Sequence, residues 1–203
     1  MRRRLYLFLN GILTMPSDTF AWTDRACRWI DANTSHKSEK YEYFSSAIFR
    51  RLFQSKRVSE VAEIIAQLST MDIILVGHSN GCDIISRLLI NYTLDIKEVH
   101  LIAGACERDF SKNGINKAMQ DGRLQDCFVY GSKSDDALKL ARNTGKFLRW
   151  FGLGYGTLGL EGALKVACKN RVHVLFRNTY RHSTWWDDER FDDTMRLITR
   201  GSV

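Results

Sequence analysis

The sequence predicts an α/β domain built on a mostly parallel, doubly wound sheet of about six strands flanked by helices. Short apolar runs rich in β-branched and aromatic residues recur along the 203 residues, and amphipathic helical patterns lie between them. Most runs are apolar throughout rather than alternating, which is typical of strands buried on both faces. The expected strands are residues 4–10, 41–44, 72–78, 98–104, 126–131 and 171–177.

Three helical stripes alternate with these strands. Apolar residues within 61–68, 84–89 and 191–198 recur at spacings of three and four, which places each set on one face of a helix. No internal repeat, linker or change of composition divides the chain. We therefore expect a single compact domain over residues 1–203, without a large cap domain.

The composition is that of an ordinary globular domain. Of the residues, 44% are hydrophobic and 26% are charged, and a chain of this length can bury a core without disulfides or metals. The formal net charge is +7, but no nucleic-acid-binding motif accompanies it, so we expect no nucleic-acid partner.

The cysteines and the N-terminus both favour a cytoplasmic protein. Five cysteines, an odd number without a CxxC pair, lie mostly in apolar runs and read as reduced thiols. The start MRRRLYLFLNGIL has the basic and apolar regions of a signal peptide, but Asn10 and Gly11 interrupt the apolar run and no small-x-small cleavage site follows closely. No segment reaches the roughly 18 apolar residues of a membrane span.

Residues 145–162 break the alternation of strands and helices. Six glycines stand among bulky apolar side chains in these eighteen residues, which predicts a flexible apolar loop. Gly154, Gly156 and Gly159 form a formal GxGxxG, but a dinucleotide site needs a preceding strand, a following helix and an acid about 20 residues on. We read the match as chance and expect neither an organic cofactor nor a metal.

The main chemical signal is the sequence GHSNG at Gly77–Gly81. It follows the apolar run 72–76 and precedes a helical pattern, which is the context that gives GxSxG its meaning. In such a sharp turn the serine, here Ser79, is raised above the sheet, and the next amide, that of Asn80, starts the helix. That amide can stabilise a developing oxyanion, helped by the helix dipole.

Through LVGHSNG at 75–81 the chain resembles the α/β-hydrolase superfamily of serine esterases, lipases and related acyl hydrolases. The resemblance implies the chain order nucleophile, acid, histidine, and cleavage of a carboxylic ester through an acyl-enzyme. The same machinery would serve a thioesterase or an acyltransferase. A catalytically silent binding module with this fold is the non-enzymatic alternative.

A serine nucleophile needs a general base, and the chain has five histidines. His36 precedes the elbow in a polar stretch, and His78 lies inside the motif, where its side chain is expected to point away from the serine hydroxyl. His100 and His173 lie within apolar strand runs and read as sheet residues. His182 follows the last expected strand, so we expect it to be the base.

The acid that orients the histidine is expected after strand 126–131. Asp135 and Asp136 stand there in the turn SKSDDAL, and the superfamily pattern maps best onto Asp135. Asp136 stays open as the alternative, as do Glu107 and Asp109 after the preceding strand. At least one of the two aspartates also suits the N-terminus of the following helix.

The resemblance places the second oxyanion donor in the loop after the first strand, at Ile12 or, failing that, Leu13. We expect Tyr155 in the glycine-rich loop and Trp185 after His182 to line a cleft for an acyl chain or another apolar group. The substrate is then a small-molecule or lipid ester. Peripheral membrane contact through the basic segment 49–57 and the apolar loop stays open.

Overall fold

A computed structural model describes residues 3–11, 16–43, 53–68, 70–150 and 156–200, with side chains except at 16–21, 144–150 and 200. Six parallel strands form one sheet in the order β2-β1-β3-β4-β5-β6, which confirms the predicted fold class. The strands are β1 Arg4–Leu9, β2 Lys37–Tyr41, β3 Asp72–His78, β4 Ile96–Ile102, β5 Leu124–Gly131 and β6 Val172–Phe176.

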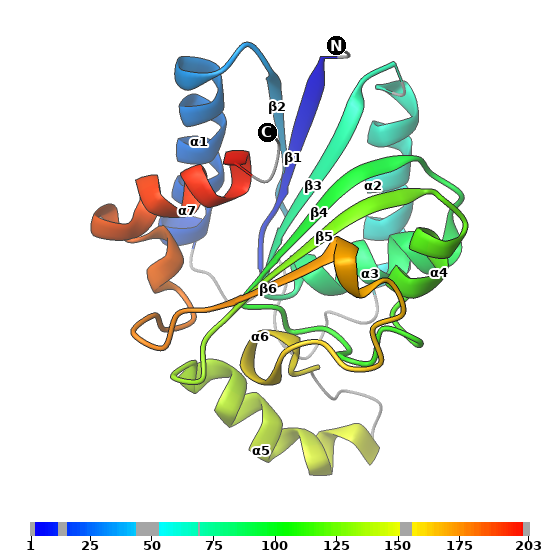
Figure 1. Cartoon of the computed structure of the whole chain (residues 1–203). Helices are drawn as coiled ribbons and strands as arrows, with labels where there is room; N and C mark the ends of the chain where they lie inside the picture. Colours follow the sequence, from blue (N-terminus) through cyan, green and yellow to red (C-terminus); the bar gives the residue numbers. More distant parts are fainter. Residues whose placement is uncertain (1–2, 12–15, 44–52, 69, 151–155, 201–203) are drawn as a thin grey trace.

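Helices cover both faces of this sheet (Figure 1). They are α1 Pro16–Asn33, α2 Gln54–Gln67, α3 Gly81–Asn91, α4 Ile115–Gln120, α5 Asp136–Trp150, α6 Leu158–Glu161 and α7 Asp188–Arg200. Helices α1 and α7 pack on one face and α2, α3 and α4 on the other, so the sheet separates two apolar cores. The predicted stripes 84–89 and 191–198 lie on the buried faces of α3 and α7, and the stripe 61–68 lies on the inner face of α2 up to its C-cap at Leu68.

The prediction for β2 was wrong in position. The strand is Lys37–Tyr41 with sequence KSEKY, and of the described residues in the expected range 41–44 only Tyr41 belongs to it. β2 lies at the edge of the sheet and pairs only with β1, so its polar side chains can face solvent. By contrast, β1, β3, β4 and β5, which come from apolar runs, are central strands of the sheet.

The prediction of a flexible loop over 145–162 was also wrong for the residues that the structure describes. Residues 145–150 continue α5, and Leu158–Glu161 form α6. The amide of Gly159 donates to Gly104 O after β4 (3.0 Å), and its carbonyl accepts from the Ser132 amide after β5 (2.8 Å). A Cβ at Gly156 or Gly159 would overlap neighbouring backbone, so these glycines permit close packing at the strand ends.

The turn between β3 and α3 is held by two close approaches. A Cβ at Gly77 would lie 2.8 Å from Gly81 C and from Ile85 Cδ1. A Cβ at Gly81 would overlap Leu9 O and lie 2.9 Å from Asn10 O, on the end of β1. Any larger residue at either position would therefore push α3 away from the sheet.

We expect Gly81→Ala to lower the free energy of unfolding by about 1–3 kcal/mol, the cost of forcing a methyl group into a filled space. Because the displaced backbone adjoins Ser79, serine reactivity should fall as well. Chemical denaturation of both proteins measures the first effect. Gly104→Ala is the matched control, because the nearest atom to its Cβ is 3.4 Å away. Equal stability of the two variants would contradict the explanation.

In the described part of the chain, none of the helices combines the length and the apolar character that a membrane crossing requires.

Candidate active site

Ser79 stands at the carboxyl end of β3 in a strained conformation. Its φ is +54°, in the left-handed region that residues with a side chain rarely adopt. Three hydrogen bonds fix it there: its amide donates to Ile102 O (3.0 Å), and its carbonyl accepts from the amides of Ala105 (3.0 Å) and Cys82 (3.2 Å). The end of β4 and the start of α3 thus impose the sharp turn predicted for GHSNG.

The residues expected to form an oxyanion hole are only partly described. Asn80 is fully buried directly before α3, so its amide belongs to the helix N-terminus. On the other side, a Cβ at Gly11 would lie 3.0 Å from Ser79 Cβ and 3.5 Å from Ser79 Oγ. The chain leaving β1 therefore runs beside the serine at Gly11, whereas the predicted donors Ile12 and Leu13 lie outside the described residues.

His182 and Asp135 meet across the carboxyl ends of β5 and β6. His182 Nδ1 lies 2.8 Å from Asp135 Oδ2, although the two residues are 47 positions apart in the sequence. A carboxylate accepts hydrogen bonds, so Nδ1 carries a proton, and in the neutral ring Nε2 then has the lone pair. That is the tautomer a general base requires.

Asp135 has two roles in this geometry. Its Oδ1 accepts a hydrogen bond from the Leu138 amide (2.8 Å), which caps the first turn of α5, while Oδ2 faces His182. The side chain is fully buried, so both oxygens are held by these partners. Asp136 instead points outward, 68% exposed, and pairs with Lys139 Nζ (3.1 Å).

Glu107 and Asp109, the other candidate acids, are engaged elsewhere. Glu107 Oε1 accepts from the Asp109 amide (3.0 Å). Asp109 Oδ2 pairs with Lys165 Nζ (2.7 Å), and this ammonium together with the Ser111 hydroxyl lowers the pKa of Asp109 to about 2. Of the four candidates, Asp135 is the carboxylate that contacts His182.

Three other histidines make contacts within the fold. His100 is fully buried in β4, with Nδ1 3.0 Å from the Tyr130 hydroxyl and Nε2 3.4 Å from Glu98 Oε2. His173 is half exposed on β6, 3.6 Å from Asp126. The ring of His36 packs against Tyr6 at 5.9 Å between ring centroids.

Tyr43 joins the site from a region that the sequence analysis assigned to a strand. Its hydroxyl accepts from Asn80 Nδ2 (2.8 Å) and donates to Asn10 O (3.0 Å), so one side chain ties the end of β1 to the nucleophile turn. The Arg57 guanidinium lies over its ring at 4.4 Å. Burial raises the pKa of Tyr43, which keeps the phenol protonated and able to donate.

The expectation that Trp185 lines a substrate cleft is corrected by its burial. It is 1% exposed, packs edge-on against Tyr180 (4.6 Å) and Tyr130 (6.1 Å), and belongs to the core under α7. A side chain without accessible surface forms no wall of an open cleft. Tyr155 and residues 49–52 of the basic segment lie outside the described residues.

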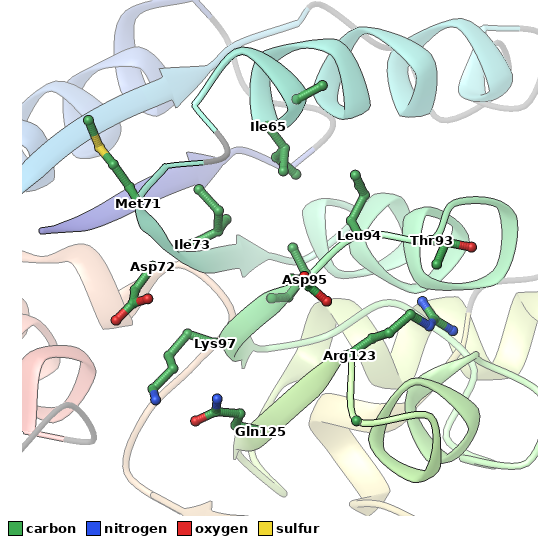
Figure 2. Close-up of a pocket in the computed structure, with 13 residues that line it drawn as sticks. Ile65, Met71, Asp72, Ile73, Thr93, Leu94, Asp95, Lys97, Arg123 and Gln125 are labelled. Atoms are coloured by element: carbon green, nitrogen blue, oxygen red, sulfur yellow. The ribbon is translucent and has the colours of Figure 1, made fainter. Parts of the chain in front are cut away.

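A hollow of about 650 Å³ lies at the opposite end of the sheet, around the amino ends of β3, β4 and β5 (Figure 2). Asp72, Lys97 and Arg123 stand on its walls, so opposite charges are mixed there. Ligands of open parallel sheets bind outside the carboxyl ends of the strands. The hollow is thus remote from Ser79 and His182.

Comparisons with known proteins identify the fold. No family model and no curated protein matches the chain. Among solved structures, it is similar to esterase PE8 (14% identity, 98% of this chain and 93% of that one, TM-score 0.59). It is also similar to MenH from S. aureus (11% identity, 99% and 95%, TM-score 0.59) and to a predicted CIB-like hydrolase from Thermoplasma acidophilum (12%, 99% and 86%, TM-score 0.60).

These similarities extend over nearly the whole chain, so the protein has the α/β-hydrolase fold that the sequence motif predicted. At 10–15% identity they show the fold alone. Any activity has to be argued from the residues of this chain.

Proposed function

We propose that the protein is a serine hydrolase that cleaves a carboxylic ester, with Ser79 as nucleophile, His182 as base and Asp135 as acid. The observation that carries the proposal is the hydrogen bond between His182 and the buried Asp135, at the same end of the sheet as the strained Ser79. A turn with a purely structural role does not require a serine in a strained conformation. Likewise, a carboxylate with a purely structural role does not have to fix the tautomer of a histidine.

In the proposed reaction Ser79 Oγ attacks the ester carbonyl carbon and His182 Nε2 takes its proton. The carbonyl oxygen becomes an oxyanion near the Asn80 amide and the chain after β1, where backbone donors stabilise the charge. As the C–O bond to the alcohol breaks, His182 returns the proton to the leaving oxygen. Water then attacks the acyl-enzyme with His182 as base again and releases the acid and free Ser79.

A fluorophosphonate tests this proposal, because an activated serine oxygen displaces fluoride from phosphorus and keeps the phosphonyl group. Intact-mass analysis of the wild type should show a single adduct. Nitrophenyl esters and acyl thioesters of increasing acyl length then separate an esterase from a thioesterase, and added alcohols reveal acyl transfer. A folded wild type that forms no adduct and turns over neither panel would contradict the proposal and favour a silent binding module.

We expect Tyr43→Phe to lower kcat about tenfold, less than the hundredfold typical of losing an oxyanion donor itself, because Tyr43 only holds the backbone that carries such donors. The phenyl ring and its contact with Arg57 remain, so the change removes one hydroxyl. Initial rates on a nitrophenyl ester provide the measurement.

Tyr41→Phe is the matched control for Tyr43→Phe. Its ring lies 5.7 Å from that of Tyr43, but its hydroxyl bonds Glu60 on α2. It should keep the wild-type rate. Equal rates for the wild type, Tyr43→Phe and Tyr41→Phe would show that the Tyr43 hydroxyl does not contribute to catalysis.

We also propose that the protein works in a reducing compartment, as expected for a cytoplasmic protein. All five cysteines are free in the structure, and Cys82, Cys106 and Cys127 are buried. Burial raises the pKa of each of these three thiols, which makes them unreactive core residues.

A further inference from the structure

The side chain of His78 links the nucleophile strand to the loop that carries His182. His78 is the last residue of β3, directly before Ser79, and its Nε2 lies 2.9 Å from the main-chain carbonyl oxygen of His182. A carbonyl oxygen only accepts hydrogen bonds, so His78 Nε2 carries the hydrogen. The centroids of the two imidazole rings are 5.0 Å apart.

The surroundings of His78 keep this ring neutral. It is 6% exposed and lies edge-on to Trp22 (6.0 Å) and Trp186 (5.9 Å), which stack on each other at 3.9 Å. Burial, followed by the nearby His182, lowers the pKa of His78 to about 3. The ring therefore stays uncharged at the pH values at which His182 would serve as a base.

The other ring nitrogen of His78, Nδ1, is buried and has no hydrogen-bond partner among the residues that the structure describes. An unpaired buried acceptor is unfavourable for folding, and an apolar side chain of similar size would avoid that cost. Packing alone therefore gives no reason for a histidine here, whereas the hydrogen bond from Nε2 to His182 does.

We propose that His78 is a positioning residue, which sets the place of the His182 loop relative to Ser79 by donating Nε2–H to the His182 carbonyl. This inference rests on the proposed function, since it concerns the approach of the base to the nucleophile. His78 acts on the main chain of His182, while Asp135 acts on its ring. Together they fix both the position and the tautomer of the base.

Three substitutions of His78 distinguish the effect of the hydrogen bond from the effect of packing. Gln places its amide nitrogen near the position of His Nε2, Asn places it near Nδ1, and Leu fills similar space without a donor. We expect His78→Leu to lower kcat at least tenfold with KM within twofold, and Tm to stay unchanged or rise. His78→Gln should recover most of the rate, and His78→Asn should not.

Nitrophenyl acetate turnover and the rate of fluorophosphonate labelling provide two readouts of Ser79 and His182. His173→Leu is the control, since it removes a half-exposed histidine on the edge strand β6. Wild-type rates in His78→Leu, or a rate loss that follows a loss of Tm and is not rescued by Gln, would overturn the inference. An inactive, unlabelled wild type would instead overturn the proposed function.

A second measurement does not depend on turnover. In two-bond ¹H–¹⁵N spectra of ¹⁵N-histidine-labelled protein, assigned with His78→Gln, His78 should show the Nε2–H tautomer from pH 5 to 8 without titrating. An Nδ1–H tautomer in this range would leave Nε2 without a hydrogen to donate to the His182 carbonyl and would overturn the inference.

Discussion

Ser79→Ala is expected to abolish fluorophosphonate labelling and to lower ester turnover by about 10⁴- to 10⁶-fold, the range found when a catalytic serine is removed from a triad. The remaining rate would come from the oxyanion donors and substrate binding alone. Because alanine has the same backbone restrictions as serine, the strain at φ +54° stays and the hydrogen bonds of the turn are kept. The variant should therefore fold with a Tm close to that of the wild type.

Ser86→Ala is the control for Ser79→Ala. Ser86 is also a buried serine, in α3, but its hydroxyl donates to Asn113 O (2.9 Å) in the loop between β4 and α4. Its loss should leave the adduct and the turnover in place. An adduct that persists in Ser79→Ala, with peptide mapping to another residue, would show that the activated nucleophile lies elsewhere.

The parts of the site that sequence reasoning could find are those encoded by neighbouring residues. The strain at Ser79 and the close approaches at Gly77 and Gly81 all arise within five consecutive positions, so GHSNG after an apolar run predicts them together. The chain order of the superfamily then pointed to Asp135 and His182. The structure brings these two side chains to 2.8 Å of each other, although their catalytic roles stay predictions.

Contacts between distant segments could not be found in this way. Tyr43 reaches Asn10 and Asn80 only because β2 ends two residues earlier, at Tyr41, and nothing local in KSEKYEY reveals that register. His78 was read as pointing away from the serine hydroxyl, but its partner is a carbonyl 104 residues further along the chain. Every residue has a main-chain carbonyl, so the sequence does not indicate which carbonyl a side chain will bond.

The errors around residues 145–162 and at Trp185 share a physical cause. Glycine was read as a sign of flexibility, whereas Gly159 allows two backbones to meet at the strand ends. A tryptophan three residues after His182 was read as a cleft wall, whereas Trp185 fills the core under α7. In both cases tertiary packing decides which of two roles the residue has: loop or close contact for the glycine, cleft wall or core for the tryptophan. The local sequence pattern carries no information about tertiary packing.

Asp135→Asn is expected to lower kcat by about 10⁴-fold, the size of effect seen when the triad carboxylate becomes an amide. Asparagine can still accept the Leu138 amide hydrogen bond through its oxygen, so the cap of α5 and the fold should survive. Its NH₂ group would then face His182 Nδ1, a donor where an acceptor stood. His182 would respond by moving its proton to Nε2, and the lone pair that should take the Ser79 proton would be lost.

Asp136→Asn makes the same chemical change one residue later and is therefore the decisive control. Asp136 is 68% exposed and pairs with Lys139 on the surface of α5, so its variant should stay within twofold of the wild-type kcat. Steady-state rates and thermal melts of the two variants test this directly. If Asp136→Asn lost activity while Asp135→Asn kept it, the hydrogen bond between Asp135 and His182 would be structural. The orienting carboxylate would then have to reach His182 from Asp136, which requires the first turn of α5 to rearrange when substrate binds.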